Sequence, residues 1–206
     1  MILTENTETF NFEGALRGAR NPMNSWGKSD SFTNEKGDFV IGENDLSLAK
    51  RLCKAGPDHR KFVRQIFVSL DITAPIYWWK EYDTYKVGTV ANSTSTMHKI
   101  HSKPFERGDF SCEKMTAPAL SCLDETIKVL EKLRLEYIES KDKELWYSII
   151  QLLPSSYNQK RTCTFSYENA FAMYKARKEH KLEEWREFCE ELKALPYFYE
   201  FFLEEI

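Results

Sequence analysis

Two unlike hydrophobic periodicities run through this sequence, and their combination constrains the fold more than any other feature. Between residues 120 and 139, Leu123, Ile127 and Leu130 are spaced four and three apart among charged residues, which predicts an amphipathic helix. The stretch KRTCTFSY alternates instead between polar and apolar residues, which predicts a strand. A chain that carries both patterns is predicted to belong to the α+β class.

The rest of the chain repeats this mixture. The first forty residues predict a strand, a helical turn and a long polar loop, and the largely apolar run from Ile66 to Ile72 predicts another strand. Further helices are predicted from an N-cap at Asn44 or Asp45 to Gly56, after Pro75, over KELWYSIIQLLP, and in two pieces from Glu168 onward. No repeat, low-complexity tract or linker interrupts the sequence, so we expect a single domain over residues 1–206.

The C-terminal segment LPYFYEFFLEEI is unusually aromatic. Exposed, it would form a large apolar patch of the kind that monomeric proteins avoid. We therefore expect it to pack back onto the domain or to be buried in a subunit interface.

Charge, cysteine usage and histidine usage limit the kinds of function. A formal net charge of −3 argues against a general nucleic-acid binder, but it leaves room for one small anion. Five cysteines without a C-x-x-C pair indicate free thiols in a reducing compartment. The H-x-x-H of His98 and His101 has no accompanying ligand cluster, so no metal is expected. We see no signal peptide and no apolar run of membrane-spanning length, and we expect a cytoplasmic protein without a membrane partner.

The segment WWKEYDTYKVGTVANSTSTMHK has two unlike halves. Its first half carries aromatic residues at helical spacings, Trp78, Trp79, Tyr82 and Tyr85. Such residues belong to a core more often than to a site. The second half, GTVANSTST, has little side-chain volume and many hydrogen-bonding groups that suit phosphate or sugar oxygens. It fits equally well an exposed loop whose Ser, Thr and Asn side chains form local turns.

Several short motifs follow one another in a fixed order. They are His59, the run Tyr85-Lys86-Val87, the N-x-x-S of Asn92 and Ser95, Leu153-Pro154, the strand TCTFSYE and Arg177. Over roughly residues 55–190 this order resembles the flavin-dependent thymidylate synthases, the ThyX family. That family has a first histidine, a signature R-H-R-x-x-S-x-N-x-x-S-x-R-Y, a Leu-Pro, an N-A-R and a helix arginine. The resemblance implies a ThyX-like domain of mixed helices and antiparallel sheet, a nucleotide ligand, and a homotetramer whose sites lie between subunits.

The chain departs from the family mainly at arginines. Counting on without a gap, the family's arginine positions fall on Tyr85, Val87, Met97, Ile150 and Glu168. Arg177 keeps the helix arginine. In the family these positions hold flavin and nucleotide, and guanidinium forks are the usual means of gripping phosphates. Because each lost charge-assisted bond costs roughly 1.5–3 kcal/mol, the resemblance implies weakened flavin binding.

Three functions remain open. The preferred hypothesis is a nucleotide-binding protein, diverged from flavin chemistry, that binds or sequesters a phosphorylated nucleotide and needs no cofactor. The first alternative is an active enzyme that uses FAD to transfer a methyl or hydroxymethyl group to a pyrimidine nucleotide such as dUMP. The second is a structural or interaction protein that keeps only the fold.

The candidate site residues follow from the register of the resemblance. The nucleotide-binding candidates are Arg177, Ser95, Asn92, Lys86, Tyr85 and His59. The secondary candidates, as substitutes for missing arginines, are Arg17, Arg20, Lys28 and Arg161. We expect an exposed Arg177 to hold a phosphate, with neutral hydrogen bonds from Ser95 and Asn92. No residue is assigned a catalytic role.

Overall fold

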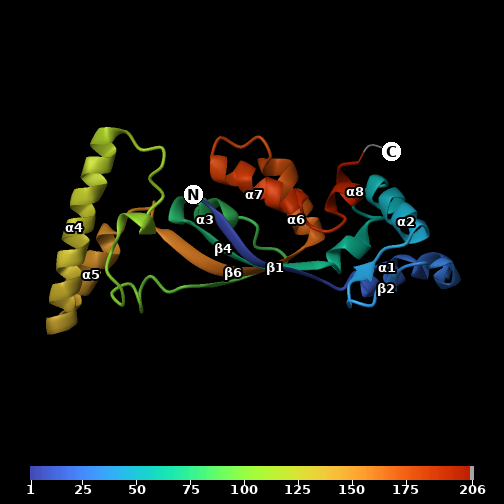
Figure 1. Cartoon of the computed structure of the whole chain (residues 1–206), viewed down its shortest axis with the longest axis horizontal. Helices are drawn as coiled ribbons and strands as arrows, with labels where there is room; N and C mark the ends of the chain where they lie inside the picture. Colours follow the sequence, from blue (N-terminus) through green and yellow to red (C-terminus); the bar gives the residue numbers. More distant parts are fainter. Residues whose placement is uncertain (205–206) are drawn as a thin grey trace. The chain divides into compact units, whose positions relative to one another are not determined.

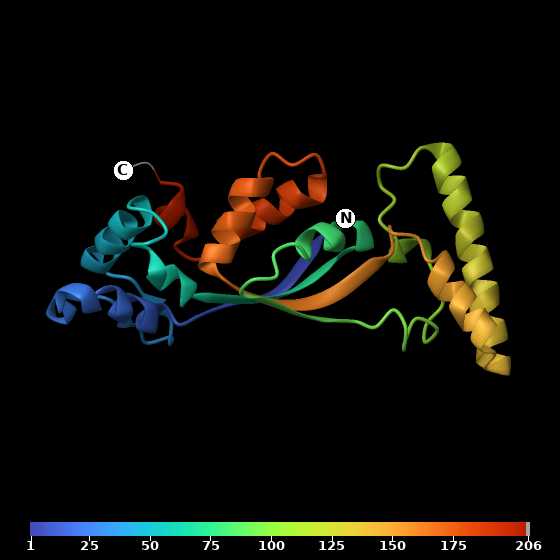
Figure 2. The ribbon, with the colours of Figure 1, turned by 180° about the vertical axis from the view of Figure 1, so that it is seen from behind.

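A computed structural model describes residues 1–204 of the chain (Figures 1 and 2). Its contacts define two compact units, and each is described by itself. Unit 1 comprises residues 1–4, 71–84 and 91–162, and unit 2 comprises residues 5–70, 85–90 and the chain from residue 163 onward. The α+β class is confirmed. The organisation of residues 1–206 as one domain stays a prediction.

Four strands form the main sheet, in the order β1-β4-β6-β5. They are β1 (Leu3–Phe10), β4 (Phe67–Pro75), β5 (Thr89–Ser93) and β6 (Asn158–Ser166). In β4 every second residue from Val68 to Ala74 is buried, because successive side chains point to opposite faces. The Thr162 hydroxyl donates to Asp71 at 2.6 Å and the Thr164 hydroxyl lies 3.4 Å from that of Ser69, a register that makes β4 and β6 antiparallel.

Strand β5 falls within the stretch GTVANSTST, for which we had weighed a ligand-binding segment against an exposed loop. It lies at one edge of the sheet, and four of its five residues are exposed. A separate antiparallel pair is formed by β2 (Phe32–Thr33) and β3 (Phe39–Val40).

Unit 1 contains three helices, α3 (Ile76–Tyr82), α4 (Ala117–Ser140) and α5 (Lys143–Leu152), with a single 3-10 turn at Arg107–Asp109. Helix α3 starts after Pro75 as predicted, and Trp78, Trp79 and Tyr82 are buried core residues. Helices α4 and α5 form a hairpin (Figure 1). One apolar core forms on this hairpin, from Ile100, Phe105, Phe110, Leu123, Leu130 and Ile149.

Unit 2 contains five α-helices and three 3-10 turns among the described residues. The helices are α1 (Phe12–Ala19), α2 (Glu43–Lys54), α6 (Tyr167–Arg177), α7 (Glu183–Lys193) and α8 (Phe198–Phe202). The 3-10 turns are Asn21–Met23, Trp26–Lys28 and Lys61–Arg64. Helices α6 and α7 pack together, as do α2 and α8 (Figure 2).

The N-cap predicted for α2 is wrong. The cap residue is Gly42, not Asn44 or Asp45. The carboxylate of Asp30, from the preceding loop, accepts the amides of Asn44 at 2.8 Å and Asp45 at 3.1 Å. A side chain from outside the helix therefore caps its first amides, where a residue at the helix start was expected to do so.

The aromatic C-terminal segment packs back onto its own unit, one of the two outcomes expected. Phe198 and Phe201 are buried, and the ring of Phe202 stacks on Phe171 with centroids 4.2 Å apart. Its last two residues lie outside the described part of the chain. This segment therefore no longer gives a separate reason to expect a subunit interface. Among residues 1–204, no helix combines the length and apolarity needed to cross a membrane.

Candidate functional site

The segment after β5 is clamped to strand β6 in unit 1. Thr94 donates its backbone amide to the carbonyl of Lys160 at 2.9 Å, and its hydroxyl reaches the same carbonyl at 3.2 Å. The side-chain amide of Gln159 donates to the Thr94 carbonyl at 2.7 Å. These bonds place the hydroxyl run Thr94-Ser95-Thr96 at the wall of a hollow of about 380 Å³.

Ser95 has a defined role within this segment. Its hydroxyl oxygen accepts the backbone amides of Met97 at 3.2 Å and His98 at 2.9 Å. This is the local turn that we had considered as the alternative for the segment. An oxygen that accepts two amides still has one proton to donate. The turn and a ligand contact are therefore compatible at Ser95.

Lysines give the hollow a positive character. Lys99, Lys103 and Lys160 line it, against one lining carboxylate, Asp109. Lys160 pairs with Asp71 at 3.1 Å, and Lys103 donates a hydrogen bond to Asp109. That bond raises the pKa of Lys103, so its ammonium stays charged. Three ammonium groups against two carboxylates leave a net positive charge that suits one phosphate, which lysine binds as a point charge.

The hollow also contains an unpaired buried donor. Asn158 lines it, and the Asn158 side-chain oxygen accepts the Ser111 hydroxyl at 2.7 Å. The Asn158 side-chain nitrogen is buried, and no described residue offers it an acceptor. Leaving such a donor unpaired costs about 1–3 kcal/mol. As the side chains stand, this nitrogen is shielded from the hollow, so a ligand oxygen would reach it only after a local rearrangement. The sequence pattern drew no attention to Asn158.

In unit 2, two of the candidate residues, Arg177 and Tyr85, are in contact, which the sequence had not predicted. The Arg177 Nε–H donates to the Tyr85 hydroxyl at 3.0 Å. The guanidinium carbon lies 4.9 Å from the ring centroid of the buried Trp185 and 5.7 Å from that of Tyr85. Arg177 is half-buried, which corrects the expectation of an exposed side chain. A guanidinium between aromatic faces is positioned by cation–π attraction.

The loop that carries Tyr85 and Lys86 is held by helix α6. Asn169 donates its side-chain amide to the carbonyl of Val87 at 2.8 Å. Gly88 has a φ of 75°, and a Cβ there would lie 3.0 Å from the Asn169 side-chain oxygen. Asn169 also forms a capping box with Ser166 at the start of α6. One side chain thus joins the helix start to the loop, while Lys86 itself is exposed.

Glu168 is the residue that the resemblance places on the arginine of the family's N-A-R. It forms an ion pair within the chain, with Arg60. Arg60 donates to Glu168 through two nitrogens, at 2.9 and 2.7 Å. Its guanidinium carbon lies 5.0 Å from the ring centroid of Phe171, and the hydrogen bond to Glu168 raises the pKa of Arg60. Sequence reasoning noted the acidic residue but missed its partner, which follows the candidate His59 in the chain. His59 is exposed in a turn.

Two of the secondary candidates already have partners within the fold. Arg20 is buried and donates from Nε to Asp45 at 2.6 Å. Arg161 pairs with Asp83 at 2.7 Å, and its guanidinium carbon lies 4.2 Å from the ring centroid of Trp79. Both guanidiniums have structural contacts that a phosphate would have to replace.

The other two secondary candidates are exposed. Arg17 borders a hollow of about 310 Å³ that also contains Trp26 and Phe32. The Lys28 side chain is exposed, and its carbonyl accepts a bond from Arg20 at 3.1 Å. Neither is placed by contacts of the kind that surround Arg177.

The structure divides the candidate residues between the two units. Asn92 and Ser95 belong to unit 1, where Asn92 is exposed on β5. Arg177, Tyr85 and His59 belong to unit 2. That Arg177, Ser95 and Asn92 hold one phosphate therefore stays a prediction. Over residues 1–204, no three His, Cys, Asp or Glu side chains cluster in a way that would hold a metal ion.

The chain is an α+β protein with the fold of the flavin-dependent thymidylate synthases. Two solved structures show this similarity, and both are thymidylate synthase X from Helicobacter pylori with FAD and dUMP. One is 17% identical with a TM-score of 0.69, covering 98% of this chain and 96% of its own. The other is 15% identical with a TM-score of 0.68, covering 98% and 97%.

The comparisons of sequence give no further assignment. No protein-family model matches the chain, and no curated protein sequence matches it either. The two solved structures confirm the predicted ThyX-like fold over nearly the whole chain, and their low identity fits a divergent sequence.

Proposed function

We propose that this protein binds a phosphorylated nucleotide on a ThyX-like fold and has diverged from flavin chemistry. The observation that carries the proposal is the unit 1 hollow, where Ser95 and three lysines line one wall. These groups offer hydrogen-bond donors and positive charge for phosphate oxygens. The similar Helicobacter pylori structures contain dUMP, which is a ligand of this chemical class.

Unit 2, taken by itself, offers a separate candidate phosphate contact, Arg177. Its contacts with Tyr85 and Trp185 present a fixed guanidinium beside aromatic faces. Such a guanidinium can bind a phosphate through its planar fork. The aromatic face of Tyr85 can stack on a base, which contributes about 1–3 kcal/mol per base. Lys86, His59 and Asn92 remain secondary contributors in this proposal, because each is exposed.

A second candidate is the flavin-dependent enzyme, favoured by the FAD in the similar solved structures. One position of this chain is unfavourable for FAD. Where the resemblance places an arginine, Glu168 and Arg60 neutralise each other. If FAD were bound, it would supply the redox chemistry, and the chain would contribute position and charge.

A thermal-shift screen of mononucleotides, dinucleotides and cyclic nucleotides tests the proposal. We expect at least one phosphorylated nucleotide to stabilise the wild type. Asn158→Asp keeps the acceptor for Ser111 but adds a negative charge. It should therefore lower the affinity for that nucleotide at least about tenfold, or ~1.4 kcal/mol. Lys99→Ala should cost about twofold to fivefold, since an exposed ion pair contributes up to about 1 kcal/mol.

Lys36→Ala, in an exposed loop of unit 2, is the matched control and should bind as the wild type does. The proposal fails if no nucleotide stabilises the wild type. The assignment of the hollow fails if folded Asn158→Asp and Lys99→Ala both retain wild-type affinity.

A further inference from the structure

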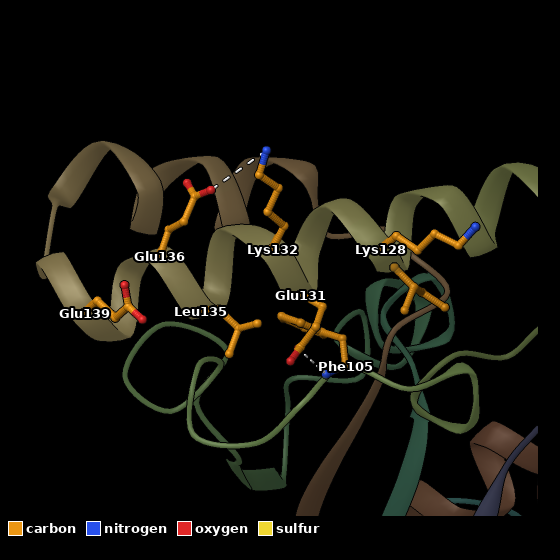
Figure 3. Close-up of a pocket in the computed structure, with 8 residues that line it drawn as sticks. Phe105, Lys128, Glu131, Lys132, Leu135, Glu136 and Glu139 are labelled. Carbon is orange, nitrogen blue, oxygen red and sulfur yellow. Dashed lines mark hydrogen bonds and ion pairs between the residues drawn. The ribbon is translucent and has the colours of Figure 1, made fainter.

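The largest hollow described for this chain lies beside α4 and has a volume of about 590 Å³ (Figure 3). Most of the charged side chains along this helix are already paired within it. The pairs are Lys128–Glu125 at 2.7 Å, Arg134–Glu131 at 2.6 Å and Lys132–Glu136 at 3.9 Å. Charges that match one another in this way do not select one ligand, so we assign no site there.

A smaller hollow in unit 2, of about 310 Å³, is walled by aromatic rings. Trp26 is 50% exposed and Phe32 is 57% exposed, while Phe39 is half-buried. The indole N–H of Trp26 donates to the side-chain oxygen of Asn21 at 2.9 Å, which holds this ring in place. Rings with this much exposed area are open to stacking, and the volume is at the lower end for small-ligand sites.

Part of the wall of this hollow is fixed by the buried Asp45. Ser29 and Ser31 donate their hydroxyls to the Asp45 carboxylate at 2.7 and 2.6 Å. Arg20, which also lines the hollow, is buried and donates to the same carboxylate at 2.6 Å. The charge of Arg20 is therefore matched within the fold, and these groups shape the hollow rather than bind its ligand.

Two opposite charges on α1 complete the lining, Glu13 and Arg17. Both side chains are exposed, and neither has a hydrogen-bond or ion-pair partner among residues 1–204. Because they are four residues apart on one helix, they share a face, with Cβ atoms about 5–6 Å apart. The hollow therefore presents a carboxylate and a guanidinium side by side, together with aromatic rings.

We propose that this hollow binds a free aromatic amino acid. The ligand ring packs among Trp26, Phe32 and Phe39, its α-carboxylate binds the Arg17 guanidinium, and its α-ammonium binds the Glu13 carboxylate. An amino acid carries both charges on one carbon, which matches two neighbouring side chains of opposite sign. A purely anionic ligand would meet Glu13 and a purely cationic one would meet Arg17, so repulsion disfavours both. The proposal is independent of nucleotide binding in unit 1.

Fluorescence titration with L-phenylalanine tests the proposal, because this ligand does not absorb where tryptophan is excited. Of the five tryptophans, all within residues 1–204, only Trp26 is exposed. We expect a saturable change with a dissociation constant of about 1 mM or lower, and loss of that change in Trp26→Phe. Phenethylamine lacks the carboxylate and 3-phenylpropionate lacks the ammonium, so each should bind at least about fivefold more weakly.

Two variants crossed with these analogues identify the contacts. Arg17→Ala should lower the affinity for L-phenylalanine at least about fivefold and leave that for phenethylamine nearly unchanged. Glu13→Gln should lower the affinity for L-phenylalanine similarly but should not weaken 3-phenylpropionate. A general effect on folding would weaken every ligand instead. Arg51→Ala, an exposed arginine on α2, is the matched control and should bind as the wild type does.

Several outcomes would overturn the proposal. They are the absence of saturable L-phenylalanine binding, or variants that bind every ligand as the wild type does. Equal affinity for L-alanine would show that the rings do not contribute. Equal affinity for N-acetyl-L-phenylalaninamide, which keeps the ring without either charge, would show that the hollow takes an aromatic side chain of a polypeptide and not a free amino acid.

Discussion

Arg177 has both a structural and a proposed binding role. Its guanidinium lies over the ring of the buried Trp185 and donates a hydrogen bond to the Tyr85 hydroxyl. The register of the resemblance placed Arg177 on the family's helix arginine, but it did not predict that α7 would bring an aromatic ring against it. Long-range packing of this kind has no local signal, because Trp185 reads simply as part of the apolar stripe of α7.

Substitution of Arg177 should therefore affect both stability and binding. Arg177→Ala should lower the affinity for the nucleotide found in the screen about tenfold to a hundredfold, because a charge-assisted hydrogen bond of roughly 1.5–3 kcal/mol is lost. It should also lower the free energy of unfolding by about 0.5–2 kcal/mol, because a cation–π contact is lost. Arg177→Lys should recover only part of the affinity, since an ammonium lacks the planar fork.

Tyr85→Phe is the matched control, because it removes the hydroxyl partner of Arg177 and keeps the ring. Calorimetric titration and urea unfolding of the three variants separate the two roles. Nucleotide affinity that is unchanged in Arg177→Ala would remove Arg177 from the proposed site.

The N-terminal part of unit 2 depends on one buried carboxylate. Asp45 on α2 is fully buried and accepts bonds from the side chains of Arg20, Ser29 and Ser31. Burial acts to raise its pKa, but these hydrogen bonds outweigh burial and hold the pKa of Asp45 below its ordinary value. This network fixes the loop between α1 and α2, which the sequence predicted only as long and polar.

Asp45→Asn should lower the free energy of unfolding by about 3–5 kcal/mol, because it leaves the buried Arg20 without its counter-charge. A carboxyl with a depressed folded pKa stabilises the fold above its unfolded pKa of about 4 and loses that contribution as the pH falls through the folded value. The difference in free energy of unfolding between wild type and Asp45→Asn should therefore be fully present at pH 7 and should shrink below pH 4. Urea unfolding at both pH values measures it.

Asp58→Asn, in an exposed turn, should change the free energy of unfolding little at either pH. An Asp45→Asn protein as stable as the wild type at pH 7 would show that the buried pair contributes no net stability.

Elements with a strong periodicity could be predicted from the sequence. The helix around Leu123 and Leu130 and the strand after Ile66 both form where expected, because each buries one regular face. Strand β5 could not be predicted, since its side chains are mostly exposed and only pairing with β6 makes it a strand. The cap of α2 was missed for a related reason: Asp30 reaches it from outside the helix.

Over the whole chain, motif order predicted the fold better than it predicted the site. The ThyX-like architecture is confirmed although five arginine positions differ, because a fold depends on apolar pattern more than on ligand contacts. Asn158 and Arg60 could not be found from motifs, since their importance comes from burial and from partners distant in sequence. The homotetramer implied by the resemblance stays a prediction.

The central claim is nucleotide binding without a firmly held flavin. Titrating purified wild-type protein in a calorimeter with a panel of nucleoside monophosphates, dUMP among them, and separately with FAD, tests it most directly. We predict a colourless protein, saturable binding of at least one nucleoside monophosphate, and weak FAD binding, because the arginines expected to grip the flavin phosphates are absent. A yellow protein with tight stoichiometric FAD, or one that binds no nucleoside monophosphate, would contradict the account.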